Sequence, residues 1–85
     1  MKSYLIRRLS LKYYRDITDT DTGLVFLTKY DAENGKCWTF LQSKLRKGAW
    51  REVGELGRMM DLLKKDVESG KAIEITEAEA FIAVL

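Results

Sequence analysis

Apolar and polar residues alternate along two neighbouring segments in the middle of the chain, residues 24–30 and 36–42. A period of two is typical of β-strands, because successive side chains point to opposite faces of a sheet. Residues 31–35 lie between the segments, and their Asn34-Gly35 pair supplies the positive φ angles that a tight turn needs. The pattern therefore predicts that the two segments form a β-hairpin.

Both faces of this hairpin carry apolar side chains. On the first strand, one face carries Leu24, Phe26 and Tyr30, and the other face carries Val25 and Leu27. On the second strand, one face carries Trp38 and Phe40, and the other carries Cys37, Thr39 and Leu41. An antiparallel sheet with one face in water shows a cleaner alternation than this. One helix can cover only one face, so we expect the other to be covered by residues 73–85, by a second copy of the chain or by another protein.

Before the hairpin, residues 3–9 predict a further strand, and the alternation of apolar and polar residues extends it to about Tyr14. A polar connection rich in Asp and Thr follows over residues 16–23. The alternative to the strand is a helix, because apolar residues also recur every four positions at Leu5, Leu9, Tyr13 and Ile17.

After the hairpin, apolar residues recur at spacings of three and four and predict an amphipathic helix over residues 50–69, closed by Gly70. The apolar stripe consists of Val53, Leu56, Met60, Leu63 and Val67, widened by Met59 and Leu62. Gly54 and Gly57 each destabilise a helix by about 1 kcal/mol relative to Ala. Either the helix approaches the sheet closely at these glycines or it begins nearer Glu55.

The C-terminal segment predicts a short strand over residues 72–75 and a short helix over residues 77–84. Thr76 and Glu79 have the spacing of a capping box, in which each side chain accepts a hydrogen bond from the backbone of the other residue. The apolar run over residues 81–85 leaves a last strand as the alternative.

Composition limits the class of protein. A chain of 85 residues allows one domain, so residues 1–85 are predicted to form a single α+β domain, an antiparallel meander packed against one main helix with a short C-terminal strand and helix. The chain has no histidine, so Ser-His-Asp and Cys-His nucleophilic sites are excluded. Its one cysteine, Cys37, allows neither an internal disulfide nor a cysteine-rich zinc site, and it fits a reducing compartment.

One acidic loop looks briefly like a calcium site, formed by Asp16, Asp19, Asp21 and Gly23. An EF-hand loop places Gly directly after the third ligand and Glu at the twelfth position. Counting from Asp16 or from Asp19, neither condition holds. We therefore expect a solvated turn, and we predict no catalytic residue, no cofactor and no metal.

Charge is unevenly distributed, although the net charge is only +2. Residues 1–51 carry 11 basic and 5 acidic side chains, whereas residues 52–85 carry 4 basic and 8 acidic ones. This asymmetry indicates either a polyanionic partner or an acidic helix lying across a basic sheet. The candidate binding residues are Lys44, Arg46, Lys47, Trp50 and Arg51. Their cations could contact phosphates and the indole could stack on a base, unless the indole lies in the core.

Three antiparallel strands followed by a helix, over residues 3–69, resemble in their order the arm-binding domain of phage-type integrases and the plant AP2 domain. Double-stranded RNA-binding domains share this order behind a preceding helix. The resemblance rests on element order alone, so it assigns no residue role, and it slightly raises the expectation of nucleic-acid binding.

The two-sided hairpin favours a non-catalytic binding or regulatory module that docks another macromolecule. The expected partner is another protein or a second copy, as for a small accessory or inhibitor protein of a phage or mobile element. The alternative is a nucleic-acid-binding domain that uses Lys44–Arg51. Since no apolar run is long enough to span a membrane, we expect no membrane partner and a cytoplasmic location.

Overall fold

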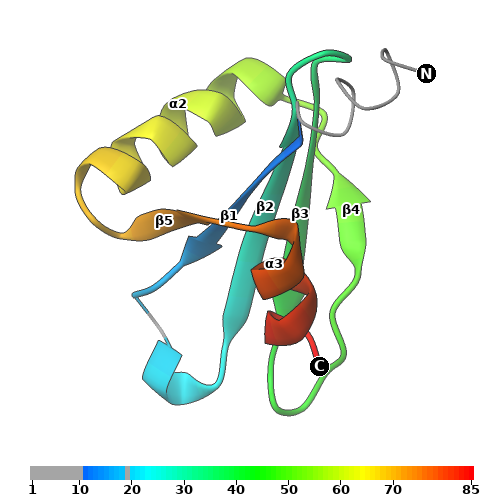
Figure 1. Cartoon of the computed structure of the whole chain (residues 1–85), viewed down its shortest axis with the longest axis vertical. Helices are drawn as coiled ribbons and strands as arrows, with labels where there is room; N and C mark the ends of the chain where they lie inside the picture. The colour runs from blue at the N-terminus through cyan, green and yellow to red at the C-terminus, as the bar shows by residue number, and fades with distance from the viewer. Residues whose placement is uncertain (1–10, 19) are drawn as a thin grey trace.

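The computed structural model describes residues 11–18 and 20–85, and Figure 1 shows them arranged around one antiparallel sheet. The elements are β1 (Leu11–Asp16), a 3-10 helix η1 (Thr20–Thr22), β2 (Val25–Asp31), β3 (Lys36–Gln42), β4 (Trp50–Glu52), α2 (Leu56–Glu68), β5 (Ala72–Ile75) and α3 (Glu77–Ala83). Strands β1 to β4 form a meander, and β5 returns to pair with the outer edge of β1, giving the order β4-β3-β2-β1-β5. The predicted α+β class is confirmed.

The β2–β3 hairpin forms as predicted, but its turn is stabilised differently. Asp31 is buried, and its carboxylate accepts hydrogen bonds from the backbone N–H of Glu33 at 3.1 Å and of Asn34 at 3.2 Å. The Asn34 side-chain amide donates to the same carboxylate at 2.7 Å. Within the turn Gly35 has a positive φ, at +62°, and Asn34 does not, so the expectation that both adopt positive φ is wrong. The acidic side chain at the end of β2 holds the turn instead.

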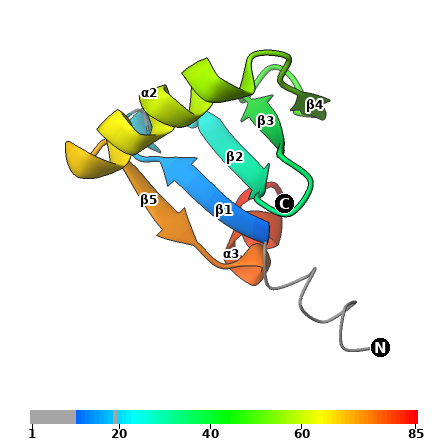
Figure 2. The same cartoon turned by 90° about the horizontal axis from the view of Figure 1, so that it is seen from above.

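Strand register decides which side chains share a face of the sheet. Leu27 lies opposite Phe40 on β3 and Arg15 on β1, so these three point to one side. Phe26 and Leu41 are paired on the other side. Figure 2 shows α2 across one side of the sheet and α3 on the other. We call the side with Phe26 and Leu41 the α2 face and the side with Leu27 and Phe40 the α3 face. The α3 face is therefore covered by the C-terminal helix of the chain itself.

The main helix begins at Leu56 and not at Trp50, so the predicted start was wrong and the alternative start near Glu55 is confirmed. Residues 50–52 instead form β4, which pairs with the edge of β3, and Val53 N–H continues the contact by donating to the Cys37 carbonyl at 2.8 Å. Four strands therefore precede the helix within the described residues, which departs from the three-strand order of the families named above. The predicted strand over residues 3–9 lies outside the described residues, and its extension is confirmed as β1.

The short C-terminal helix is confirmed, and the alternative of a last strand is wrong. Glu79 N–H donates to the Thr76 hydroxyl at 3.1 Å, and Thr76 N–H donates to the Glu79 carboxylate at 2.9 Å, which completes the predicted capping box. The helix carries Ala80 into a core with Leu27 and Phe40. The half-buried apolar residues packed around this core are Tyr13, Val25, Trp50, Ile75 and Val84.

Candidate binding surfaces

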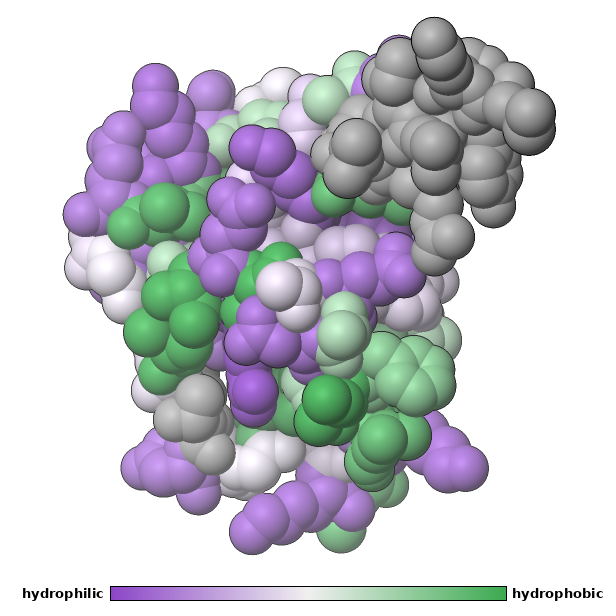
Figure 3. Space-filling model, viewed as in Figure 1, coloured by the Kyte–Doolittle hydropathy of each residue, from purple (hydrophilic) through white to green (hydrophobic). Residues whose placement is uncertain are grey.

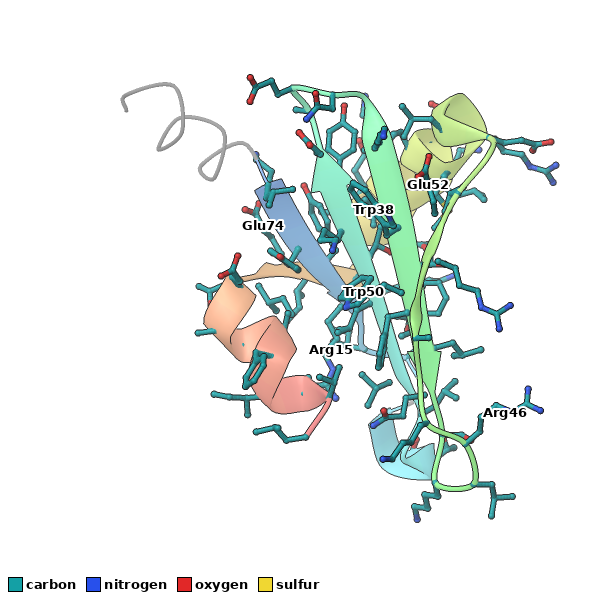
Figure 4. The ribbon with its side chains drawn as sticks, turned by 90° about the vertical axis from the view of Figure 1, so that its right-hand side faces the viewer. Arg15, Trp38, Arg46, Trp50, Glu52 and Glu74 are labelled. Atoms are coloured by element: carbon teal, nitrogen blue, oxygen red, sulfur yellow. The ribbon has the colours of Figure 1, made fainter. Side chains whose placement is uncertain are left out.

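The three cations of the predicted site lie in the loop between β3 and β4. Lys44, Arg46 and Lys47 are all exposed, and none forms a salt bridge within the described part of the chain. The loop turns tightly, because Ser43 and Arg46 form an isolated antiparallel bridge. Figure 4 shows Arg46 at the far end of this loop, pointing away from Trp50. We call residues 44–47 the basic loop.

Trp50 and the basic loop do not form one continuous surface. Its ring packs against Phe40 with centroids 5.3 Å apart and against Tyr13 at 6.3 Å in an edge-to-face arrangement. Arg51 follows directly and is exposed on the α2 face, opposite Thr39, because neighbours on a strand point to opposite sides. The structure therefore separates the five predicted residues into an exposed loop, a half-buried ring of the core and a single cation on the other face.

A lysine that the sequence reasoning missed lies between the two tryptophans. The Lys29 ammonium is 4.9 Å from the ring centroid of Trp38 and 4.7 Å from that of Trp50, which are distances of cation–π contacts. Both rings lie on the α3 face, and Figure 4 shows them with Glu52. The register of the hairpin places Lys29 directly opposite Trp38, and this pairing was the signal available in the sequence. Arg15 shares the face, and its buried Nε has no hydrogen-bond partner in the described structure.

The outer side of α3 is apolar and exposed. Because Ala80 and Val84 point into the core, the neighbouring Phe81 and Ile82 point outward and are 67% and 65% exposed. Leu85 is 85% exposed, and it borders a hollow that the basic loop lines from the other side. Figure 3 shows the apolar side chains gathered over α3 and the end of the chain. We call Phe81, Ile82 and Leu85 the C-terminal apolar surface.

A second hollow, of about 440 Å³, lies on the α2 face between the helix and the sheet. We call it the α2 pocket. Its apolar lining consists of Leu24, Phe26, Met59, Leu62, Leu63 and Ala72. Its polar lining consists of the carboxylates Asp16 and Asp66 and the hydroxyls of Tyr14 and Thr28. Burial raises the pKa of the Tyr14 hydroxyl, and Glu74 and Tyr30 raise it further, so this group remains a neutral hydrogen-bond donor.

The wide apolar stripe of α2 explains why a hollow remains between this helix and the sheet. Leu63 is the only buried residue of α2, at 6% exposed, whereas Leu62 is 49% and Val67 41% exposed. The apolar stripe is wider than the part of the sheet it meets, so some of its side chains line a hollow and others face water. Leu63 and Leu62 both line the hollow, the first buried and the second half exposed.

The acidic loop is a local turn in the part that the structure describes. The Asp16 carboxylate accepts from the backbone N–H of Thr18 at 2.8 Å and from its hydroxyl at 2.5 Å, as in an Asx turn. Among the described residues, no group of three or more His, Cys, Asp or Glu side chains is placed to hold a metal ion. Cys37 is fully buried on the α2 face, and burial raises the pKa of its thiol.

Comparisons with known proteins identify no relative. No family model, no curated protein and no solved structure matches the chain. Over the residues that the structure describes, neither helix is long and apolar enough to cross a membrane.

Proposed function

We propose that the chain is a non-catalytic binding domain that docks another protein through the C-terminal apolar surface. The observation that carries this is the exposure of Phe81 and Ile82 on a helix whose other side is already packed in the core. Soluble proteins rarely expose several large apolar side chains together, and such patches commonly mark interfaces. The basic loop borders the same hollow, so a complementary partner surface is apolar at its centre and acidic at its edge.

Photo-crosslinking tests this assignment. Phe81→p-benzoylphenylalanine places a photoreactive group of similar shape on the surface, and Val67→p-benzoylphenylalanine places it on exposed α2 as a matched control. After irradiation in an extract of the source organism, with nucleic acid digested, we expect a discrete protein adduct from position 81 alone. An adduct with the chain itself identifies a second copy as the partner.

A variant then tests the contribution of the surface to affinity. The double change Phe81→Ser and Ile82→Ser leaves the core side of α3 intact, so the purified partner should bind far more weakly while the fold is kept. The same adducts from both positions, or full binding by the double variant, would overturn the proposal.

Nucleic-acid binding is the second candidate function, and it is supported by the exposed cations of the basic loop, none of which forms an ion pair with a described acidic residue. Because Trp50 packs on Phe40 and Arg51 lies on the other face, only Lys44, Arg46 and Lys47 remain as a phosphate-binding set. Three contacts predict a slope of log affinity against log salt near about −2.7 on duplex DNA. Changing all three to Ala should abolish that slope, and no binding of the wild type at low salt rules this function out.

A chain with no histidine and one buried thiol supports a binding role without catalysis, and we extend the proposal to the absence of a resident cofactor. The unpaired cysteine also supports a reducing, cytoplasmic location.

A further inference from the structure

We infer that the α2 pocket binds a small amphipathic ammonium compound, with its cation held between Asp16 and Asp66 and its apolar body lying toward Leu24, Phe26 and Leu62. The pocket is separate from the surface of the proposed function, because α2 and α3 lie on opposite sides of the sheet (Figure 2). The inference is therefore independent of the protein partner.

Size and lining favour a small molecule. The volume of about 440 Å³ falls within the range of roughly 300–1,000 Å³ that small-ligand sites occupy. Six of its ten lining residues are apolar, and the remaining four offer two carboxylates and two hydroxyls. Among the described residues that line the pocket none is basic, and the charged ones, Asp16 and Asp66, are negative. A mostly apolar cavity with a few converging polar groups is typical of a binding site.

The two carboxylates are brought to the same end of the pocket by one loop. Asp66 accepts, through its backbone carbonyl, a hydrogen bond from Lys71 N–H at 2.8 Å, and the Lys71 carbonyl accepts one from Ile17 N–H at 2.9 Å. Asp16 precedes Ile17 and is paired with Ala72 on β5. The loop after α2 thus ties the helix position of Asp66 to the end of β1.

The electrostatics of this end favour a cation. Neither Asp16 nor Asp66 forms a salt bridge in the described structure. Thr18 occupies Asp16 Oδ1, so Asp16 Oδ2 and the Asp66 carboxylate are the oxygens that can meet a cation. Asp66 lies in the last turn of α2, where the backbone carbonyls add the negative end of the helix dipole. The Tyr14 and Thr28 hydroxyls add uncharged hydrogen-bonding groups. An ammonium group satisfies these acceptors, whereas a carboxylate in the same place would be repelled.

Apolar side chains line the pocket beside the carboxylates. Leu24, just before β2, and Phe26 on β2 supply one wall, and Leu62 supplies the wall on α2, where its side chain is half exposed. An alkyl or aromatic body can bury against these walls while its amine reaches the acidic end. The ligand class is consequently a primary amine with a single apolar tail, and not a polyamine, which has no such tail.

Titrations with four probes test this inference. Octylammonium combines the cation and the tail, 1-octanol and octanoate keep the tail without the cation, and spermidine keeps the cation without the tail. Chemical shifts of backbone amides measure each affinity and show whether the pocket residues respond. We expect octylammonium to bind at least about tenfold more tightly than 1-octanol, with octanoate and spermidine weaker still.

Two pairs of variants localise the effect. Asp66→Asn should weaken octylammonium binding about tenfold and leave 1-octanol unchanged, whereas Asp61→Asn, at an exposed acid of the same helix outside the pocket, should change neither. Leu62→Trp should block both probes by filling the opening, while Val67→Trp should not. Equal affinities for octylammonium and octanoate, or the same effect of Asp66→Asn and Asp61→Asn, would overturn the inference.

Discussion

The loop between β3 and β4 passes so close to the core at Gly48 that an added methyl group has no room. A Cβ built there would lie 2.6 Å from Phe40 Cε1 and 2.8 Å from Cε2, with Cζ closer still. Carbon atoms pack at about 3.5–4.0 Å, so the ring would have to move by roughly 1 Å. Phe40 is only 5% exposed and packs on Trp50 at 5.3 Å, so a shift of its ring would disturb the core.

Gly48→Ala should therefore destabilise the fold by about 1–3 kcal/mol, the usual effect of overpacking a core. In a domain of this size each 1 kcal/mol lowers Tm by about 4–8 °C. Gly48 does not have the positive φ that would strain an alanine by itself. Where space is free, replacing such a glycine by alanine stabilises a protein by about 0.4–1 kcal/mol. The sign of the change in the free energy of unfolding therefore distinguishes a crowded site from an open one.

Urea unfolding followed by tryptophan fluorescence measures the free energy of unfolding. Gly57→Ala is the matched control: nothing lies within 4 Å of its added Cβ and it is inside α2, so it should stabilise by up to about 1 kcal/mol. Phe40→Leu shortens the ring and should remove part of the clash, giving a coupling with Gly48→Ala of about 0.5–3 kcal/mol. Wild-type stability of Gly48→Ala, or simple additivity with Phe40→Leu, would refute the reasoning.

Four further outcomes follow from the described contacts. Thr76→Ala removes the cap of α3 and should lower the free energy of unfolding by about 1 kcal/mol, and no loss would contradict its capping role. Trp50→Ala removes a half-buried core ring and should lower it by about 3 kcal/mol, whereas an unchanged value would indicate a free ring. Burial raises the pKa values of Cys37 and Tyr14 above 9.0 and 10.0, so the folded state disfavours their ionised forms. Stability present below about pH 9 should then be lost as pH rises through the folded pKa values, with a smaller loss in Tyr14→Phe, and a flat urea midpoint up to about pH 11 would contradict this. EDTA should leave Tm unchanged, and a fall of several degrees would reveal a structural metal.

Elements that depend on local signals could be predicted from the sequence. The β2–β3 hairpin follows from alternation on both sides of a turn, and α3 follows from Thr76 and Glu79 at capping-box spacing. The strand β4 could not be predicted in this way, because Trp50 and Val53 also fit the helical period that continues at Leu56. Their conformation is decided by pairing with β3, a contact that no short window of sequence contains.

The same pairing explains the fate of the candidate site. On the predicted helix, which begins at Trp50, Trp50 and Arg51 would lie about 100° apart around the helix axis. On a strand, Trp50 and Arg51 point to opposite faces, so the ring enters the core and the cation does not follow it. The basic loop, by contrast, has neither the period of a strand nor that of a helix, and it forms the connection between β3 and β4.

The position of β1 between β2 and β5 has a consequence for the order of events during biosynthesis. Strands β2, β3 and β4 follow β1 closely and can pair as they emerge, whereas the partner of its outer edge is the last strand to be made. Until β5 has been made and has paired, β1 presents an unpaired edge and, without α3, the sheet has an uncovered aromatic face. The chain is therefore most prone to aggregate while it is still being translated, and slower translation of residues 53–75 would lengthen that exposure.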